Sequence, residues 1–289
     1  MARFGVRKLA KEADRLRAEY LDAVNRGDPT SALRIGTEQL LPVSENLVDQ
    51  SDEYLNPLAV TLQNLSVICH QLERPIGQFY FAQRSFHVAT LVGDRGLGLH
   101  PSLADIGGIT ATIATHLAGR RLPGLGHLSR ADERLLFPAA ALVPTSIELM
   151  GQLDSFPWAR QMRLAATMLR KLSIRDLKVV DCESRARVWL ARLALNLGDR
   201  KFATAEIKGA LILWIDQLGS TSRYWSTELP ETWTMAADML ESLSRQKAAT
   251  SIRQAIQQAT AGRHGVSGLS DIAGVLDLRE HYRAALAAL

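Results

Sequence analysis

Few residues in this chain have the types and spacing needed for chemistry. His70 and His116 fall at equivalent positions of two predicted helices, which would suit a shared groove or a metal ion, but no third ligand accompanies them. Asp181 and Glu183 could act as acid and base, yet nothing pairs them with a nucleophile or an apolar pocket. Acidic residues in the first turn of a helix, where they complement the helix dipole, explain this pair equally well.

The signatures of strong metal and nucleotide sites are missing from the sequence. It contains no HExxH, no paired CxxC and no GxxxxGK[ST]. The glycines at 93–98 and 119–126 do not follow a predicted strand, so they are interpreted as turn glycines. Cys69 and Cys182 lack metal-ligand spacing and are expected to be buried thiols in a reducing compartment. We therefore predict no catalytic residue, no metal and no cofactor.

Composition favours a soluble helical protein. The chain has 289 residues, is 47% hydrophobic and only 6% aromatic, and has few stretches of alternating β-branched residues. Its net charge of +4 is spread over 34 basic and 30 acidic residues, so nucleic-acid binding is not favoured. The most apolar run, 106–118, is shorter than the roughly 20 residues that span a bilayer. With no signal peptide recognised at the N-terminus, we expect a cytoplasmic protein with no membrane segment.

Residues 187–211, RVWLARLALNLGDRKFATAEIKGAL, are typical of a helix, a Gly-Asp turn and a returning helix. Similar hairpins are predicted along the chain. One helix is expected to end before Pro42, and another to open at 100–102. An amphipathic helix is expected at 276–289. Consecutive predicted turns are about 45 residues apart, from 27 to 74, from 74 to 119 and from 198 to 244. This period indicates stacked helix pairs. The longer interval between 119 and 198 fits two shorter units.

Small and large apolar residues recur at fixed places within these hairpins. The clearest set is Leu190, Ala191, Ala194, Gly198, Asp199, Ala203, Ile207 and Ala210. Shorter sets are Trp233, Ala236, Ala237, Leu240 and Ala249, and Leu62, Leu65, Ser66, Cys69, Ala82 and Ser85. This pattern resembles the tetratricopeptide repeat (TPR), and the longer period is similar to that of kinesin light chain. Arg187 departs from the pattern, because it stands where a Trp is usual.

The resemblance implies an all-α, right-handed superhelical solenoid of stacked antiparallel helix pairs. About five or six units would occupy residues 1–262. Residues 263–289 would add a short flexible segment and a C-terminal helix, within the same domain, that caps the solenoid or forms a homodimer. Another helical-repeat or bundle fold is the alternative.

In the TPR family the first helix of each pair lines a concave face that binds a ligand. Carried onto this sequence, the resemblance implies the binding positions Asn64, His70, Gln71, Thr110, His116, Trp189, Arg192, Asn196, Met235, Asp238 and Glu241. Arg and Asn at such positions can bond to the backbone or carboxylate of an extended peptide. Each position also has a simpler interpretation as a solvated polar residue. Tyr224 and Trp225 are interpreted as an interaction anchor or as a plug over the solenoid edge.

We expect a non-enzymatic module that binds a protein or peptide, as an adaptor or regulator. A second hypothesis is a ligand- or peptide-sensing regulator that acts on transcription or signalling through a partner protein. A third is a helical enzyme whose active site is assembled from dispersed residues. The sequence does not identify the partner.

Overall fold

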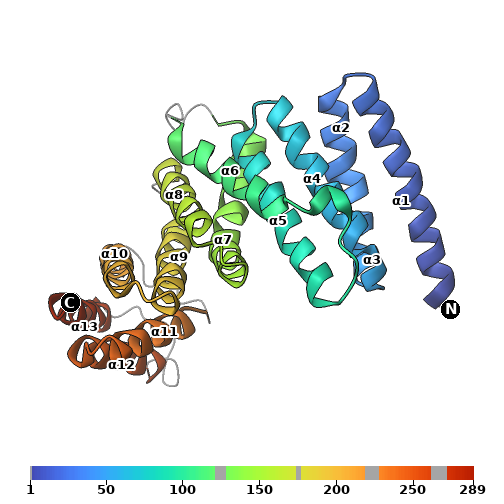
Figure 1. Ribbon diagram of the computed structural model, residues 1–289. Helices are drawn as coiled ribbons and strands as arrows, with labels where there is room; N and C mark the ends of the chain where they lie inside the picture. The colour runs from blue at the N-terminus through green and yellow to red at the C-terminus, as the bar shows by residue number, and fades with distance from the viewer. Residues whose placement is uncertain (1, 121–127, 174–176, 219–227, 262–271) are drawn as a thin grey trace. The chain divides into compact units, whose positions relative to one another are not determined.

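The computed structural model describes residues 2–120, 128–173, 177–218, 228–261 and 272–289 (Figure 1). Every regular element in these ranges is helical and no strand occurs in them, so the predicted all-α class is confirmed. The chain divides into two compact units, residues 1–149 and 150–289, a division that the sequence pattern did not predict.

The first unit is a series of helices joined by short turns. Its elements are α1 (Ala2–Asn25), α2 (Pro29–Ile35), the π-helical turn η1 (Gly36–Leu40), α3 (Leu41–Val48), the 3-10 turn η2 (Asp52–Tyr54), α4 (Leu55–Gln71), α5 (Pro75–Asp94), the 3-10 turn η3 (Pro101–Leu103), α6 (Ile106–Gly119) and α7 (Arg130–Gln152), whose last residues belong to the second unit.

Glycine and proline begin and end these helices as their backbone preferences require. Gly27 adopts φ +71°, which L-residues rarely tolerate, and so ends α1. Asp28 then caps α2 by accepting a hydrogen bond from the Ser31 N–H at 2.9 Å, and Pro29 occupies the first position of α2. These features form the predicted turn at 26–29.

Two predicted boundaries were wrong. The helix does not end before Pro42, because the chain continues through the π turn into α3, and the Leu41 N–H reaches back five residues to the Gly36 carbonyl. This wider turn places Pro42 at the start of α3, where its missing N–H costs nothing. At 100–102 only a 3-10 turn begins, and α6 starts later, at Ile106.

Helix α7 is joined to α5 by buried polar contacts. Asp132, 3% exposed, accepts the Gly77 N–H at 2.9 Å and so satisfies a free donor in the first turn of α5. Gln83 donates to the Ala139 carbonyl at 3.1 Å and accepts from Ser146 at 3.0 Å. Of the described helices, α7 alone is long and apolar enough to cross a membrane, and half of its most apolar stretch is buried within the protein.

The second unit contains the clearest predicted hairpins. Its elements are α8 (Phe156–Leu172), α9 (Leu177–Asn196), α10 (Arg200–Leu218), α11 (Glu228–Ser242), α12 (Gln246–Ala261) and α13 (Ile272–Ala287). In the hairpin that α9 and α10 form, Gly198 has φ +81° and ends α9, while Asp199 accepts a hydrogen bond from the Phe202 N–H at 3.0 Å. The helical residues of the predicted pattern in this hairpin are fully buried: Leu190, Ala191, Ala194, Ala203, Ile207 and Ala210.

An aromatic cluster connects the last helices of the second unit. Trp214 of α10, Trp233 of α11 and Tyr282 of α13 have ring centroids 5.2–6.1 Å apart. Leu278 and Ala285 are buried beside Tyr282, and α13 packs on α10 and α12. The apolar face of α13, which was expected to cap the solenoid or to form a homodimer, therefore packs against α10 and α12 of the same chain. Tyr224 and Trp225 lie outside the described residues.

Candidate functional site

A groove of about 680 Å³ opens where α9 and α11 pack side by side in the second unit. Four of the predicted binding residues line it together: Arg192 and Asn196 from α9, and Met235 and Asp238 from α11. The two helices place these residues there although about 40 positions separate the pairs in sequence. The volume lies within the roughly 300–1,000 Å³ typical of ligand sites.

Each wall of the groove follows from helical spacing. Arg192 and Asn196 are one turn apart on α9 and both are exposed. On α11, Thr234 and Asp238 are also four residues apart and exposed. Polar side chains therefore face the opening from both helices.

Sequence reasoning missed several residues of this groove. Beside the predicted Met235, Leu195 and the buried Met239 supply its apolar part, and Glu231 and Thr234 extend the polar wall of α11. Pro230 and Ser242 complete the lining. The three- and four-residue spacing from 231 to 242 on one helix face was available in the sequence and would have indicated this set.

Arg192 is held in place without a carboxylate partner in the described parts of the chain. Its guanidinium lies 5.3 Å from the centre of the Trp189 ring and within 3.9 Å of the Met235 sulfur. Trp189 is half-buried beside the groove and does not line it. Stacking on an aromatic ring orients a guanidinium while leaving its N–H donors available to an anionic or carbonyl group.

The acidic side of the groove is partly neutralised from α12. Arg253 forms ion pairs with Glu241 and with Asp238, the latter at 2.7 Å. The hydrogen bond from Arg253 lowers the pKa of Glu241. Glu241, although predicted as a binding residue, does not line the groove and instead helps join α11 to α12. Glu231 has no ion-pair partner among the described residues, so it is the uncompensated acid of the groove.

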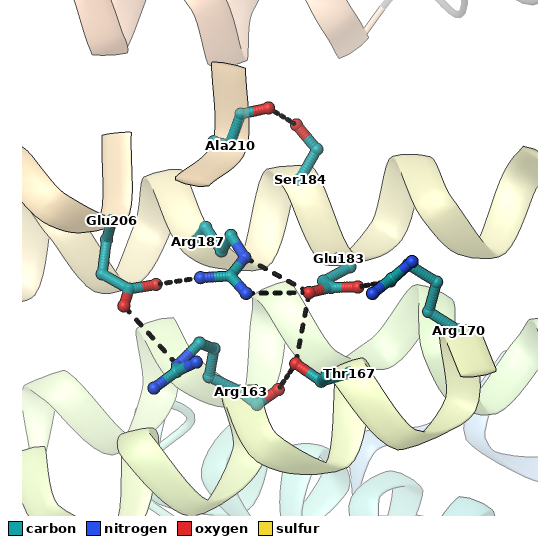
Figure 2. A network of polar contacts seen from close by, with 8 residues as sticks. All are labelled: Arg163, Thr167, Arg170, Glu183, Ser184, Arg187, Glu206 and Ala210. Carbon is teal, nitrogen blue, oxygen red and sulfur yellow. Dashed lines mark hydrogen bonds and ion pairs between the residues drawn. The ribbon is translucent and has the colours of Figure 1, made fainter. Parts of the chain in front are cut away.

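A buried ion network holds α9 against α8 and α10, as Figure 2 shows. The Glu183 side chain, 0% exposed, lies 2.5 Å from Arg170 of α8 and 3.0 Å from Arg187 one turn along α9. Thr167 of α8 also donates a hydrogen bond to Glu183 at 3.2 Å. The proposal that Glu183 complements the dipole of a helix N-terminus was therefore wrong, because it lies beyond the first turn and is paired with arginines.

The same network explains the departure of Arg187 from the repeat pattern. Arg187 reaches from Glu183 to Glu206 of α10, 3.1 Å away, and Glu206 also pairs with Arg163 at 3.6 Å (Figure 2). Gly209 leaves room for the Arg187 side chain, since a Cβ at this position would lie 2.9 Å from a guanidinium nitrogen of Arg187. The ion network thus joins α9 to α8 and α10 and supports the helix that supplies one wall of the groove.

The predicted binding residues in the first half of the chain do not line this groove. Asn64 is half-buried on α4, while His70, Gln71 and His116 are exposed near the ends of α4 and α6. The prediction that Thr110 is a binding residue was wrong. It is 0% exposed, and its hydroxyl contacts the Ile106 and Ala82 carbonyls at 2.7 and 3.1 Å, so the contact between α6 and α5 buries it.

Within the described residues, no group of three His, Cys, Asp or Glu side chains is arranged to hold a metal ion. Cys69 and Cys182 are both free and buried.

The chain has no significant match among protein-family models, curated proteins or solved structures. The resemblance to TPR therefore rests on the motif residues alone.

Proposed function

We propose that this chain is a non-enzymatic, cytoplasmic module that binds an extended peptide segment of a partner protein in the groove between α9 and α11. The carrying observation is the groove itself, which brings Arg192, Asn196, Met235 and Asp238 together around an opening of about 680 Å³. In this proposal the helix pairs stack as a TPR-like solenoid, and the groove belongs to its concave face.

The chemistry of the groove suits a peptide more than a purely apolar or purely charged ligand. Arg192 presents guanidinium donors, and Asn196 presents both a donor and an acceptor, which matches peptide carbonyl, amide and carboxylate groups. Across the opening, Glu231 can accept from a basic side chain. Met235 and Met239 form an adaptable apolar surface for the side chains between these polar contacts.

The C-terminal helix leaves this groove accessible. Helix α13 packs on α10 and α12 through Leu278, Tyr282 and Ala285, and none of the residues lining the groove comes from it. Among the described residues, the groove is therefore not filled by the chain's own terminal helix. A peptide added from outside does not have to displace α13.

The proposal is tested by selecting a displayed random-peptide library on the full chain and measuring the enriched peptides by fluorescence polarisation. Truncating both Arg192 and Asn196 to Ala should weaken binding by about tenfold or more, since two central polar contacts are lost. The matched control is K208A/Q257A, which removes one cation and one amide from exposed positions of α10 and α12 outside the groove. Equal affinities for the two double variants, or no enrichment on the wild type, would contradict the assignment.

A further inference from the structure

A second hollow lies wholly within the first unit. It has a volume of about 500 Å³ and opens between the α2 segment with its π turn, the start of α5 and the first turns of α7. It shares no residue with the groove of the second unit, and its volume is again typical of a small-molecule site.

The inner surface of this pocket is apolar. Leu33, Leu41 and Phe81 are at most 8% exposed and line it, with Leu135 half-buried beside them. Cys69 also contributes, and burial raises the pKa of this thiol to about 12. Its neutral sulfur therefore acts as another apolar surface.

The π turn shapes one wall of the pocket. Gly36 packs so tightly on the inner side that an added Cβ would lie 2.5 Å from Leu65 and 3.3 Å from Tyr20. The next two residues, Thr37 and Glu38, line the pocket. A π turn inside a helix is uncommon, and such turns are frequent at functional sites.

Three arginines converge on this pocket from separate elements. Arg34 comes from α2, Arg74 is the N-terminal cap residue of α5, and Arg134 comes from α7. None of the three forms an ion pair within the described parts of the chain. Among the described residues that line the pocket, Glu38 is the only carboxylate, so three positive charges face one negative charge.

We propose that this pocket binds an amphipathic small-molecule carboxylic acid. Its carboxylate is held by Arg34, Arg74 and Arg134, and its apolar body lies on the surface of Leu33 and Phe81. Guanidinium groups pair with carboxylates in a planar, two-bonded geometry, which favours an anion at the rim. The buried apolar wall favours a hydrocarbon body, because a fully polar anion would leave that wall in contact with water.

The test is isothermal titration calorimetry of the full chain with sodium decanoate below its micelle concentration. Decanol and acetate serve as probes that lack the charge or the apolar body, respectively. The pocket variant is R34Q/R134Q, which changes two exposed side chains and leaves the buried surface intact. The control is R7Q/R26Q, which removes the same charge from exposed positions of α1 and the turn that follows it, outside the pocket.

Decanoate should bind the wild type and R7Q/R26Q saturably and with equal affinity, and should bind R34Q/R134Q about tenfold more weakly or worse. Decanol and acetate should each bind at least about tenfold more weakly than decanoate. Equal dissociation constants for the two double variants overturn the proposal, as does tight binding of decanol or an absence of saturable decanoate binding.

Discussion

Replacing Glu183 by Gln tests whether the ion network of Figure 2 holds the second unit together. The substitution keeps the shape of the side chain and removes its charge. Glu183 is fully buried between Arg170 and Arg187, whose side chains are 30% and 16% exposed. Removing one partner of a buried ion pair costs about 3–5 kcal/mol, because the opposite charge stays buried without compensation. Since both arginines retain some contact with water and Arg187 keeps its ion pair with Glu206, we expect the lower end, about 3 kcal/mol.

Urea unfolding followed by tryptophan fluorescence provides the measurement. All five tryptophans lie between residues 158 and 233, so the signal reports on the second unit. With urea dependences of about 1–3 kcal/mol per molar, a loss of about 3 kcal/mol lowers the midpoint by roughly 1–3 M.

The control for this experiment is Glu280→Gln in the same unit. Glu280 pairs with Arg283 on the surface, with side chains 65% and 49% exposed, and such pairs contribute about 0–1 kcal/mol. A midpoint for Glu183→Gln that matches this control would refute the reasoning, since the network would then contribute no more than a solvated pair.

Three further predictions concern the first unit. Gly36→Ala should lower the free energy of unfolding by about 1–2 kcal/mol in circular-dichroism melts, because the new methyl group meets buried Leu65 and the gain in helix propensity offsets only part of the strain. Burial and the nearby Arg84 lower the pKa of His87, so folding disfavours its protonated form. The free energy of unfolding should therefore fall as the pH drops below about 6.5, and between about pH 7.5 and 5.5 this fall should be smaller in His87→Gln than in the wild type. Parallel pH profiles of stability for the two proteins would contradict the prediction. Cys69 should resist a thiol reagent near pH 8 in the native protein and react after unfolding, because burial raises its pKa to about 12; rapid native labelling would show an open site.

Four of the ten described residues that line the groove of the second unit were predicted from the sequence. The resemblance to the TPR implied Arg192 and Asn196 on the first helix of one predicted hairpin, and Met235 and Asp238 on the first helix of the next. The repeat pattern then suggested that the two faces belong together. Thr110 came from the same resemblance, which implies a face of α6 but does not reveal that α5 covers Thr110.

Many of the helices, several of their ends and part of the apolar core could be predicted from the sequence alone. These features depend on neighbours within a turn or two: apolar periodicity, glycines with positive φ, and capping side chains. Only the tertiary structure decided which helix faces meet. The chain continues through a π turn, so that Pro42 lies at the start of α3 and does not follow a helix end. Helix packing also joins Glu183 of α9 to Arg170 of α8. It also brought Arg34 and Arg134 to one pocket across about 100 residues of chain. Such convergence depends on how helices pack, and local spacing carries no information about it.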